Sequence, residues 1–251
     1  MGLMSFLGLG ASDLTEKQID KISKLAANPF AQPDVRREQM EKLIRDGSEA
    51  SIRGLLQRLT VNASQGIADE DEKRFVVEEL IAMGKKAVPP ILQFLKRETN
   101  LTFAAHALLG ILPKDEGLGE LLALFDVYSP DDYRSDEQKR QLVLLFKEHD
   151  DPRIAPALVP YLLDHSDDVR HQVLEYFAEK KMFDSTVAAA VGQLIRDKDT
   201  SPRIARQAAE IAADHDWQLA GDSTINGVLD QEFFLDKKGF VRRRVTPQQK
   251  R

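Results

Sequence analysis

Apolar residues recur at intervals of three and four along most of the chain, as they do in helices that bury one face. Up to Gln231 no segment alternates between apolar and polar residues as a half-buried strand does. The pattern predicts an all-α protein with helices over 19–25, 35–44, 52–59, 76–81, 88–95, 101–112, 118–125, 142–146, 154–162, 169–177, 187–195 and 204–212.

Polar residues suited to capping helix N-termini recur once in roughly 30 to 37 residues, which is the period of a helical-pair solenoid. A side-chain oxygen at such a position accepts a backbone N–H that has no partner inside the helix. One pair of helices cannot bury its own apolar face, so neighbouring pairs must stack. We therefore expect an α-solenoid of about six antiparallel pairs, whose second helices begin near Asp34, Asp71, Asn100, Asp136, Asp167 and Ser201.

Two tetrapeptides carry a family resemblance. Pro33-Asp34-Val35-Arg36 and Asp167-Asp168-Val169-Arg170 resemble the Asp-x-Val-Arg motif that opens the second helix of HEAT repeats, including the phycobilin-lyase-type subgroup. The resemblance covers about residues 15–216 and implies an armadillo-like, right-handed superhelix. Other repeats depart from the motif, and in Ser201-Pro202-Arg203-Ile204 the arginine is shifted.

The arginines of this motif occupy an unusual position for a charge. On a helical wheel Arg36 and Arg170 fall inside the apolar stripes of their helices. An arginine at the edge of a core needs acceptors for its N–H groups. The HEAT resemblance implies a structural ladder of Asp and Arg side chains between repeats, here Asp34, Arg36, Asp168 and Arg170. The alternative is that these residues bind a ligand.

The ends of the chain differ from the helical repeats in composition. Residues 1–14 are apolar but lack the basic start of a signal peptide, so we expect a flexible segment and leave open a weak membrane or partner contact. Residues 217–245 are expected to cap the repeat domain 15–216. Residues 246–251 form a basic tail.

A hairpin is predicted within the cap. Residues 231–235 and 240–245 flank Asp236-Lys237-Lys238-Gly239, in which the glycine suits a left-handed turn position. The hairpin and Trp217 are expected to cover the apolar end of the last helix pair. The alternative is an arm that binds a partner.

Composition and charge exclude several kinds of chemistry. The 251 residues include no cysteine, which excludes disulfides and thiolate zinc sites and fits a reducing, cytoplasmic location. The net charge is -6, although residues 236–251 hold seven cationic residues and one aspartate. The acidic remainder disfavours nucleic acid as a partner. No apolar run approaches the roughly 18 residues of a membrane span.

Residues typical of catalytic or metal sites are scattered. None of the five histidines is followed by glutamate, as the resemblance to HEAT-like di-iron enzymes would require, and we predict no metal and no cofactor. The acidic run 69–72 lacks the ligand spacing of a calcium loop and is expected to be a solvated cluster. We predict that the chain is not an enzyme. The alternative is a HEAT-like enzyme, either a lyase or one that modifies nucleic acid.

The predicted function is a non-catalytic scaffold or adaptor that binds a protein or peptide. The resemblance implies that second helices line the concave face. Because a helix turns once in 3.6 residues, side chains two and six residues after the first core residue of a helix point away from the core. The first core residues predicted for the six second helices are Val35, Val76, Leu101, Leu142, Val169 and Ile204. The alternative is that Phe103 and Leu144 pack on neighbouring helices. The predicted partner-binding stripe comprises Arg37, Glu78, Phe103, Leu144, His171, Glu175, Arg206 and Glu210.

Overall fold

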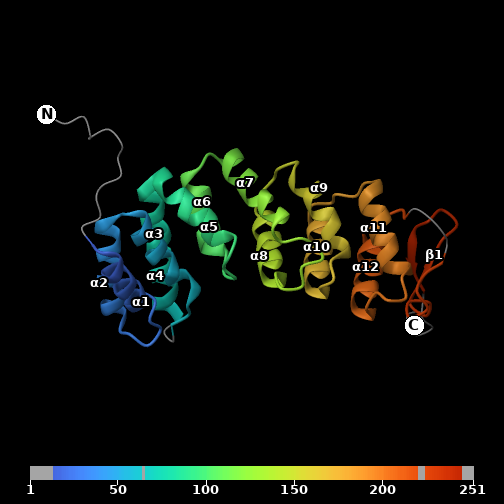
Figure 1. The fold of residues 1–251 in the computed structure, drawn as a ribbon. Coiled ribbons are helices and arrows are strands. Elements are labelled where there is room, and N and C mark those ends of the chain that lie inside the picture. Colours follow the sequence, from blue (N-terminus) through green and yellow to red (C-terminus); the bar gives the residue numbers. More distant parts are fainter. Residues whose placement is uncertain (1–13, 64–65, 220–223, 245–251) are drawn as a thin grey trace. The chain divides into compact units, whose positions relative to one another are not determined.

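The computed structural model describes residues 14–63, 66–219 and 224–244, which form a mostly helical chain with a small antiparallel sheet (Figure 1). All the predicted helical segments are confirmed as helices. The segment 1–14, except for Leu14, and the tail 246–251 lie outside the described residues. No helix within the described ranges is long and apolar enough to cross a membrane. The chain divides into two compact units, Met1–Val127 and Tyr128–Arg251.

Unit 1 arranges its helices in two layers. In one layer α1 packs against α3 and α3 against α5, and in the other α2 packs against α4 and α4 against α6. The layers meet where α1 contacts α2 and α5 contacts α6. The elements are α1 (Glu16–Ala26), α2 (Pro33–Asp46), α3 (Glu49–Leu56), η1 (Gln57–Thr60), α4 (Gly66–Met83), η2 (Gly84–Ala87), α5 (Val88–Leu95), α6 (Thr102–Ile111), α7 (Lys114–Leu122) and η3 (Ala123–Asp126).

Unit 2 repeats this pattern. The helix α8 packs against α10 and α10 against α12, while η4 packs against α11 on the other side. The elements are α8 (Asp136–Lys147), α9 (Ile154–Leu158), η4 (Val159–Leu163), α10 (Asp167–Glu179), α11 (Ser185–Arg196), α12 (Pro202–Asp214), β1 (Phe233–Leu235) and β2 (Val241–Arg243).

The predicted start of the apolar stripe is wrong in α2. Val35 is 42% exposed, whereas Arg36 is only 1% exposed and takes the core-facing position. The stripe of α2 therefore begins one residue later than expected. In the other second helices the expected first core residues are buried.

Several helix starts also differ from the prediction. Ser201 caps α12 as expected, because its hydroxyl accepts the N–H of Ile204. Asp34 and Asp167 lie instead inside the first turns of α2 and α10, where a carboxylate favours the positive end of the helix dipole. The helix α4 begins at Gly66, so Asp71 lies in its second turn and does not cap it.

The predicted hairpin is confirmed. The strands β1 and β2 pair antiparallel, with Leu235 opposite Val241. Gly239 has φ +85, and a Cβ there would lie 2.7 Å from the carbonyl oxygen of Leu219, so the turn needs glycine. The strand β2 packs against α12, and the buried Trp217 stacks on Phe183 at 4.3 Å. The hairpin thus covers the end of the last helix pair.

Candidate functional site

The exposed side of α2, α4 and α6, here called the second-helix face of unit 1, holds three residues of the predicted stripe. Arg37 on α2 and Glu78 on α4 are exposed, and Phe103 on α6 is half-buried. Phe103 is therefore not an ordinary core residue. Two pockets lie side by side on this face, one between α2 and α4 and one between α4 and α6.

The α2–α4 pocket is built around an aromatic ring that the sequence pattern did not single out. The guanidinium carbon of Arg37 lies 3.2 Å from the centre of the Phe75 ring. Arg37 also donates from Nε to Glu41 Oε1 at 3.2 Å. A guanidinium over a ring is attracted by the negative charge of the ring face. The pocket is lined by Arg37, Glu41, Ile44, Arg45, Phe75 and Glu79.

The α4–α6 pocket, of about 410 Å³, is acidic and contains the Phe103 ring. Glu70 binds Arg74 at 2.9 Å, one turn along α4. Glu78 forms no ion pair with any described residue. The pocket therefore offers an unneutralised carboxylate beside an aromatic surface. Its lining residues are Glu70, Arg74, Val77, Glu78, Thr102, Phe103 and His106.

In unit 2, the predicted stripe residues Leu144, His171 and Glu175 lie on the packed pair α8 and α10. Leu144 is 47% exposed and so is not buried between helices. Lys147 donates to Glu175 Oε2 at 3.3 Å, which joins α8 to α10. His171 Nε2 lies 3.5 Å from the other oxygen of Glu175. Charged groups thus adjoin an exposed leucine.

The last two stripe residues of unit 2 do not pair with each other. Arg206 donates at 2.8 Å to Oε1 of Glu232, which lies in the turn before β1. Glu210 forms no ion pair with a residue that the structure describes. Arg206 therefore ties α12 to the cap. A continuous stripe through both units stays a prediction.

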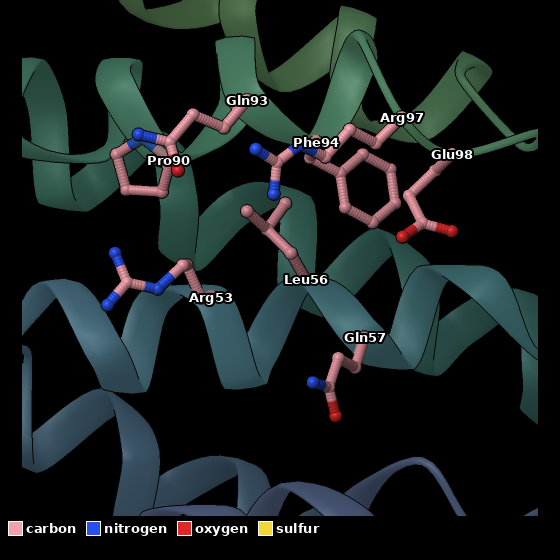
Figure 2. A pocket seen from close by; sticks show the side chains of 8 residues that line it. All are labelled: Arg53, Leu56, Gln57, Pro90, Gln93, Phe94, Arg97 and Glu98. Carbon is pink, nitrogen blue, oxygen red and sulfur yellow. The ribbon is translucent and has the colours of Figure 1, made fainter. Parts of the chain in front are cut away.

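A groove between α3 and α5 lies in the other helix layer of unit 1 (Figure 2). Arg53 and Leu56 come from α3 and Gln57 from η1, and the remaining residues come from α5 and the turn after it. The apolar pattern of the sequence does not indicate this groove, because it marks only the core residues of each helix. Its lining residues are Arg53, Leu56, Gln57, Pro90, Gln93, Phe94, Arg97 and Glu98.

The expected ladder residues make different contacts from those that the motif implies. Arg36 binds Glu72 of α4, and Asp34 forms no ion pair with a described residue. In unit 2 Asp168 accepts from Arg203 of α12 at 2.6 Å. Arg170 instead binds Asp167 within its own helix turn. Contacts between successive pairs are present, but their chemistry varies from one pair to the next.

Arg36 belongs to a buried group of charges, here called the α2–α4 ion cluster. It comprises Arg36, Arg58, Asp69, Glu72 and Lys73, all 7% exposed or less. Glu72 accepts from both arginines, each time at 2.8 Å. Asp69 accepts from Arg58 and pairs with Lys73 at 2.7 Å. The prediction of a solvated acidic run is therefore wrong for Asp69 and Glu72, because they neutralise buried cations.

The electrostatics of this cluster favour the charged form of Asp69. Burial by itself raises the pKa of Asp69, but hydrogen bonds from Lys73, the Ala63 N–H and Arg58 more than offset that effect and lower the pKa. The hydrogen bond to Glu72 raises the pKa of Arg36. The cluster joins α2, η1 and α4 and so has a structural role.

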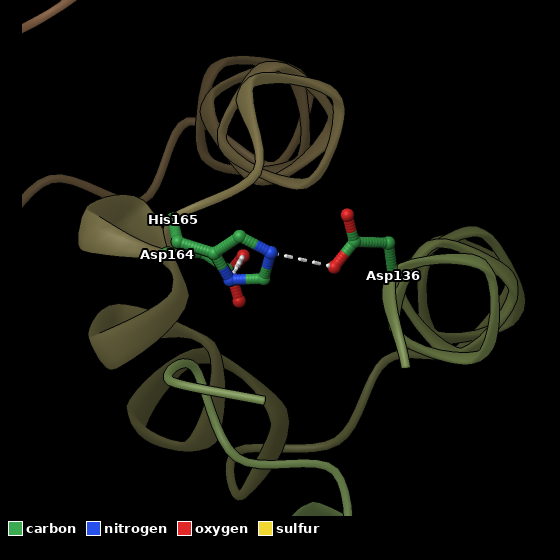
Figure 3. Close-up of side chains that lie close together, drawn as sticks. All are labelled: Asp136, Asp164 and His165. Atoms are coloured by element: carbon green, nitrogen blue, oxygen red, sulfur yellow. Dashed lines mark ion pairs between the residues drawn. The ribbon is translucent and has the colours of Figure 1, made fainter. Parts of the chain in front are cut away.

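Unit 2 contains a second group, here called the Asp164 cluster, formed by Asp136, Lys139, Asp164 and His165. Figure 3 shows three of these side chains, Asp136, Asp164 and His165. His165 Nε2 lies 3.0 Å from Asp136 Oδ1, and its Nδ1 lies 3.3 Å from Asp164 Oδ1. The side chains of Lys139 and Asp164 are 0% exposed and pair at 2.8 Å. Sequence reasoning missed this group because Asp136 and His165 lie in different helix pairs.

The Asp164 cluster has the residue types of a metal site. Asp136, Asp164 and His165 offer ligand atoms within 4.8 Å of one another. The ammonium of Lys139, however, lies 2.8 Å from Asp164 Oδ2 and 3.4 Å from Asp136 Oδ1. A cation bound there would be repelled by this ammonium, which already neutralises the buried carboxylate. These residues therefore fit a structural ion cluster better than a metal centre.

Comparisons with known proteins identify no relative. No protein-family model, no curated protein and no solved structure matches the chain.

Proposed function

We propose that this chain is a non-catalytic scaffold of the HEAT-like α-solenoid type, which binds a protein or peptide through its second helices. Two features support the proposal. Within each unit, second helices pack against second helices. Ion pairs join successive second helices, as with Arg36 and Glu72 and with Asp168 and Arg203.

The observation that carries the binding role is the second-helix face of unit 1. Phe75 and Phe103 are half-buried rings set among charged side chains in adjacent pockets. Protein-binding surfaces concentrate their binding energy in such aromatic positions, with polar residues around them. Glu78 adds a carboxylate without an ion-pair partner among the described residues, which favours a partner with a cationic group near an apolar one.

A displayed library of random peptides, selected on the immobilised full chain, tests this proposal. Selected peptides are synthesised, and their affinities for the wild type and Phe103→Ala are compared by fluorescence anisotropy. We expect Phe103→Ala to weaken binding by roughly tenfold or more, as truncation of an interface aromatic does. Glu78→Gln should weaken peptides that carry a lysine or arginine.

Phe30→Ala is the matched control. Phe30 is 93% exposed between α1 and α2, outside both pockets, so its truncation should leave the affinity unchanged. Thermal unfolding of each variant shows whether it is folded. Selected peptides that bind Phe103→Ala and Glu78→Gln as tightly as the wild type would contradict a role for this face.

A further inference from the structure

The α3–α5 groove combines cationic side chains with an apolar floor (Figure 2). Arg53 on α3 and Arg97 after α5 line a depression of about 240 Å³, whose floor contains Leu56, Pro90 and Phe94. The floor residues are buried, with Phe94 9% exposed, so the packing of both helices holds them in place. The groove is therefore a preformed feature of unit 1.

The groove lining holds two cationic side chains, Arg53 and Arg97, and one carboxylate, that of Glu98, and the segment that contains α5 is rich in lysine. Residues 84–98 hold Lys85, Lys86, Lys96 and Arg97 but one carboxylate, that of Glu98. None of these four cationic side chains forms an ion pair with a described residue. The whole chain has a net charge of -6, so this local excess runs against the overall balance. Cations without ion-pair partners attract anionic ligands.

The shape of the groove favours a peptide over a lipid surface. The apolar floor lies between two helices, where a single protruding side chain can reach it. A flat bilayer contacts a convex or flat surface and would not reach the buried faces of Leu56 and Phe94. Guanidinium groups also bind carboxylates with two parallel hydrogen bonds, which fixes the direction of a bound chain.

We propose that the α3–α5 groove binds an acidic peptide segment of a partner protein. A large apolar side chain of that segment rests on Leu56, Pro90 and Phe94, and a neighbouring carboxylate pairs with Arg97. Arg53, which already binds Glu49, provides a second guanidinium at the edge of the groove. This site lies in a different helix layer from the second-helix face, so either proposal can fail alone.

The test uses an eight-residue peptide of alternating Asp and Leu with an uncharged fluorophore, titrated with the full chain and followed by anisotropy. Arg97→Gln should weaken binding on the order of tenfold, as expected for the loss of one charged hydrogen-bonded pair. Lys21→Gln removes one positive charge from the exposed side of α1, outside the groove and both pockets, and should change the affinity by less than about twofold, because solvent screens a charge that does not contact the peptide. Amide chemical-shift changes should map to α3 and α5.

Other outcomes overturn the proposal. Equal weakening by Arg97→Gln and Lys21→Gln would show attraction to net charge alone. Equal binding of an Asp-Ser peptide would show that the apolar floor has no role, and equal binding of a Lys-Leu peptide would remove the charge argument. Binding of the chain to phosphatidylserine vesicles without binding of the Asp-Leu peptide would assign the cations to a membrane. Shift changes confined to other helices would place the peptide elsewhere.

Discussion

Both units bury charged side chains near the start of a second helix, but they neutralise them differently. In unit 1, Glu72 accepts from Arg36 and Arg58, and Asp69 is bound by Arg58 and Lys73. In unit 2, the fully buried Asp164 has Lys139 as its one buried cation, and the partly exposed His165 lies beside it. The two clusters therefore differ in how many donors each buried carboxylate receives.

The difference reverses the direction of the pKa shift. Burial raises the pKa of Asp164, and the hydrogen bonds from Lys139 and the Ser166 N–H do not fully offset it, so the pKa stays raised. The additional donors to Asp69 bring its pKa below the usual value. Two cations with a backbone N–H thus lower the pKa of the buried Asp69 carboxyl, whereas one buried cation with a backbone N–H leaves the pKa of Asp164 raised.

The largest predicted effect is that of Arg58→Met. This change leaves Asp69 and Glu72 buried with fewer donors, and removing one partner of a buried pair costs about 3 to 5 kcal/mol. Hydrogen exchange of unit 1 amides, measured at increasing urea concentrations, gives the loss of unfolding free energy. Arg53→Met on the exposed side of α3 is the control, and a loss as small as the control's would show that the cluster contributes little to stability.

Lys139→Met should have a smaller effect. It removes the buried cation beside Asp164, but the already raised pKa lets this carboxyl take up a proton, which limits the loss to about 2 to 3 kcal/mol. The double variant Lys139→Met with Asp164→Asn removes both charges and should recover most of that loss. Fluorescence of Trp217, the single tryptophan, reports the unfolding of unit 2. A double variant less stable than Lys139→Met would contradict this account.

The stabilities of the two units should depend on pH in opposite directions. The lowered pKa of Asp69 stabilises the folded state at pH values above the unfolded-state pKa of about 3.9. This stabilisation is lost as the pH falls through the folded-state pKa of Asp69. The raised pKa of Asp164 makes stability depend on pH in the opposite direction. Its contribution is complete below about pH 3.9 and is lost as the pH rises through the folded-state pKa.

The measurement compares variants, because other carboxylates also titrate in this range. Asp164→Asn should remove a loss of unit 2 stability with rising pH, and Asp69→Asn should remove a loss of unit 1 stability with falling pH. The variants are made with His165→Gln, which removes the imidazole beside Asp164. If Asp69→Asn and Asp164→Asn change the pH slope in the same direction, the comparison between the clusters fails.

Helix positions followed from the sequence because burial of one helix face leaves a repeating apolar pattern. The hairpin was predictable for a local reason as well, since Gly239 supplies the left-handed turn between two apolar segments. The start of α4 was not predictable in this way. The capping pattern predicts a start near Asp71, although residues from Gly66 onward are helical.

Contacts between distant residues account for most of what the sequence left undetermined. Arg36 was recognised at a core edge, but its partner Glu72 lies 36 residues away in a run that looked solvated. A helical wheel places a side chain on a face and says nothing of which residue neutralises it. Phe75 and the α3–α5 groove were missed for a related reason, since pockets form between helices that the pattern treats singly.

The smallest predicted effect tests whether burial is what distinguishes the two clusters. Arg203 and Asp168 also join successive helix pairs, at 2.6 Å, but their side chains are 55% and 58% exposed. An exposed ion pair gains little electrostatic energy in water and loses side-chain entropy. A double-mutant cycle of Asp168→Asn and Arg203→Gln should therefore give a coupling energy below about 1 kcal/mol. High salt should lower this coupling energy further. A coupling above about 2 kcal/mol would mean that position between helix pairs, rather than exclusion of water, determines the strength of these contacts. The large loss expected for Arg58→Met would then need a different explanation, because the same bond geometry would stabilise the chain equally at its surface.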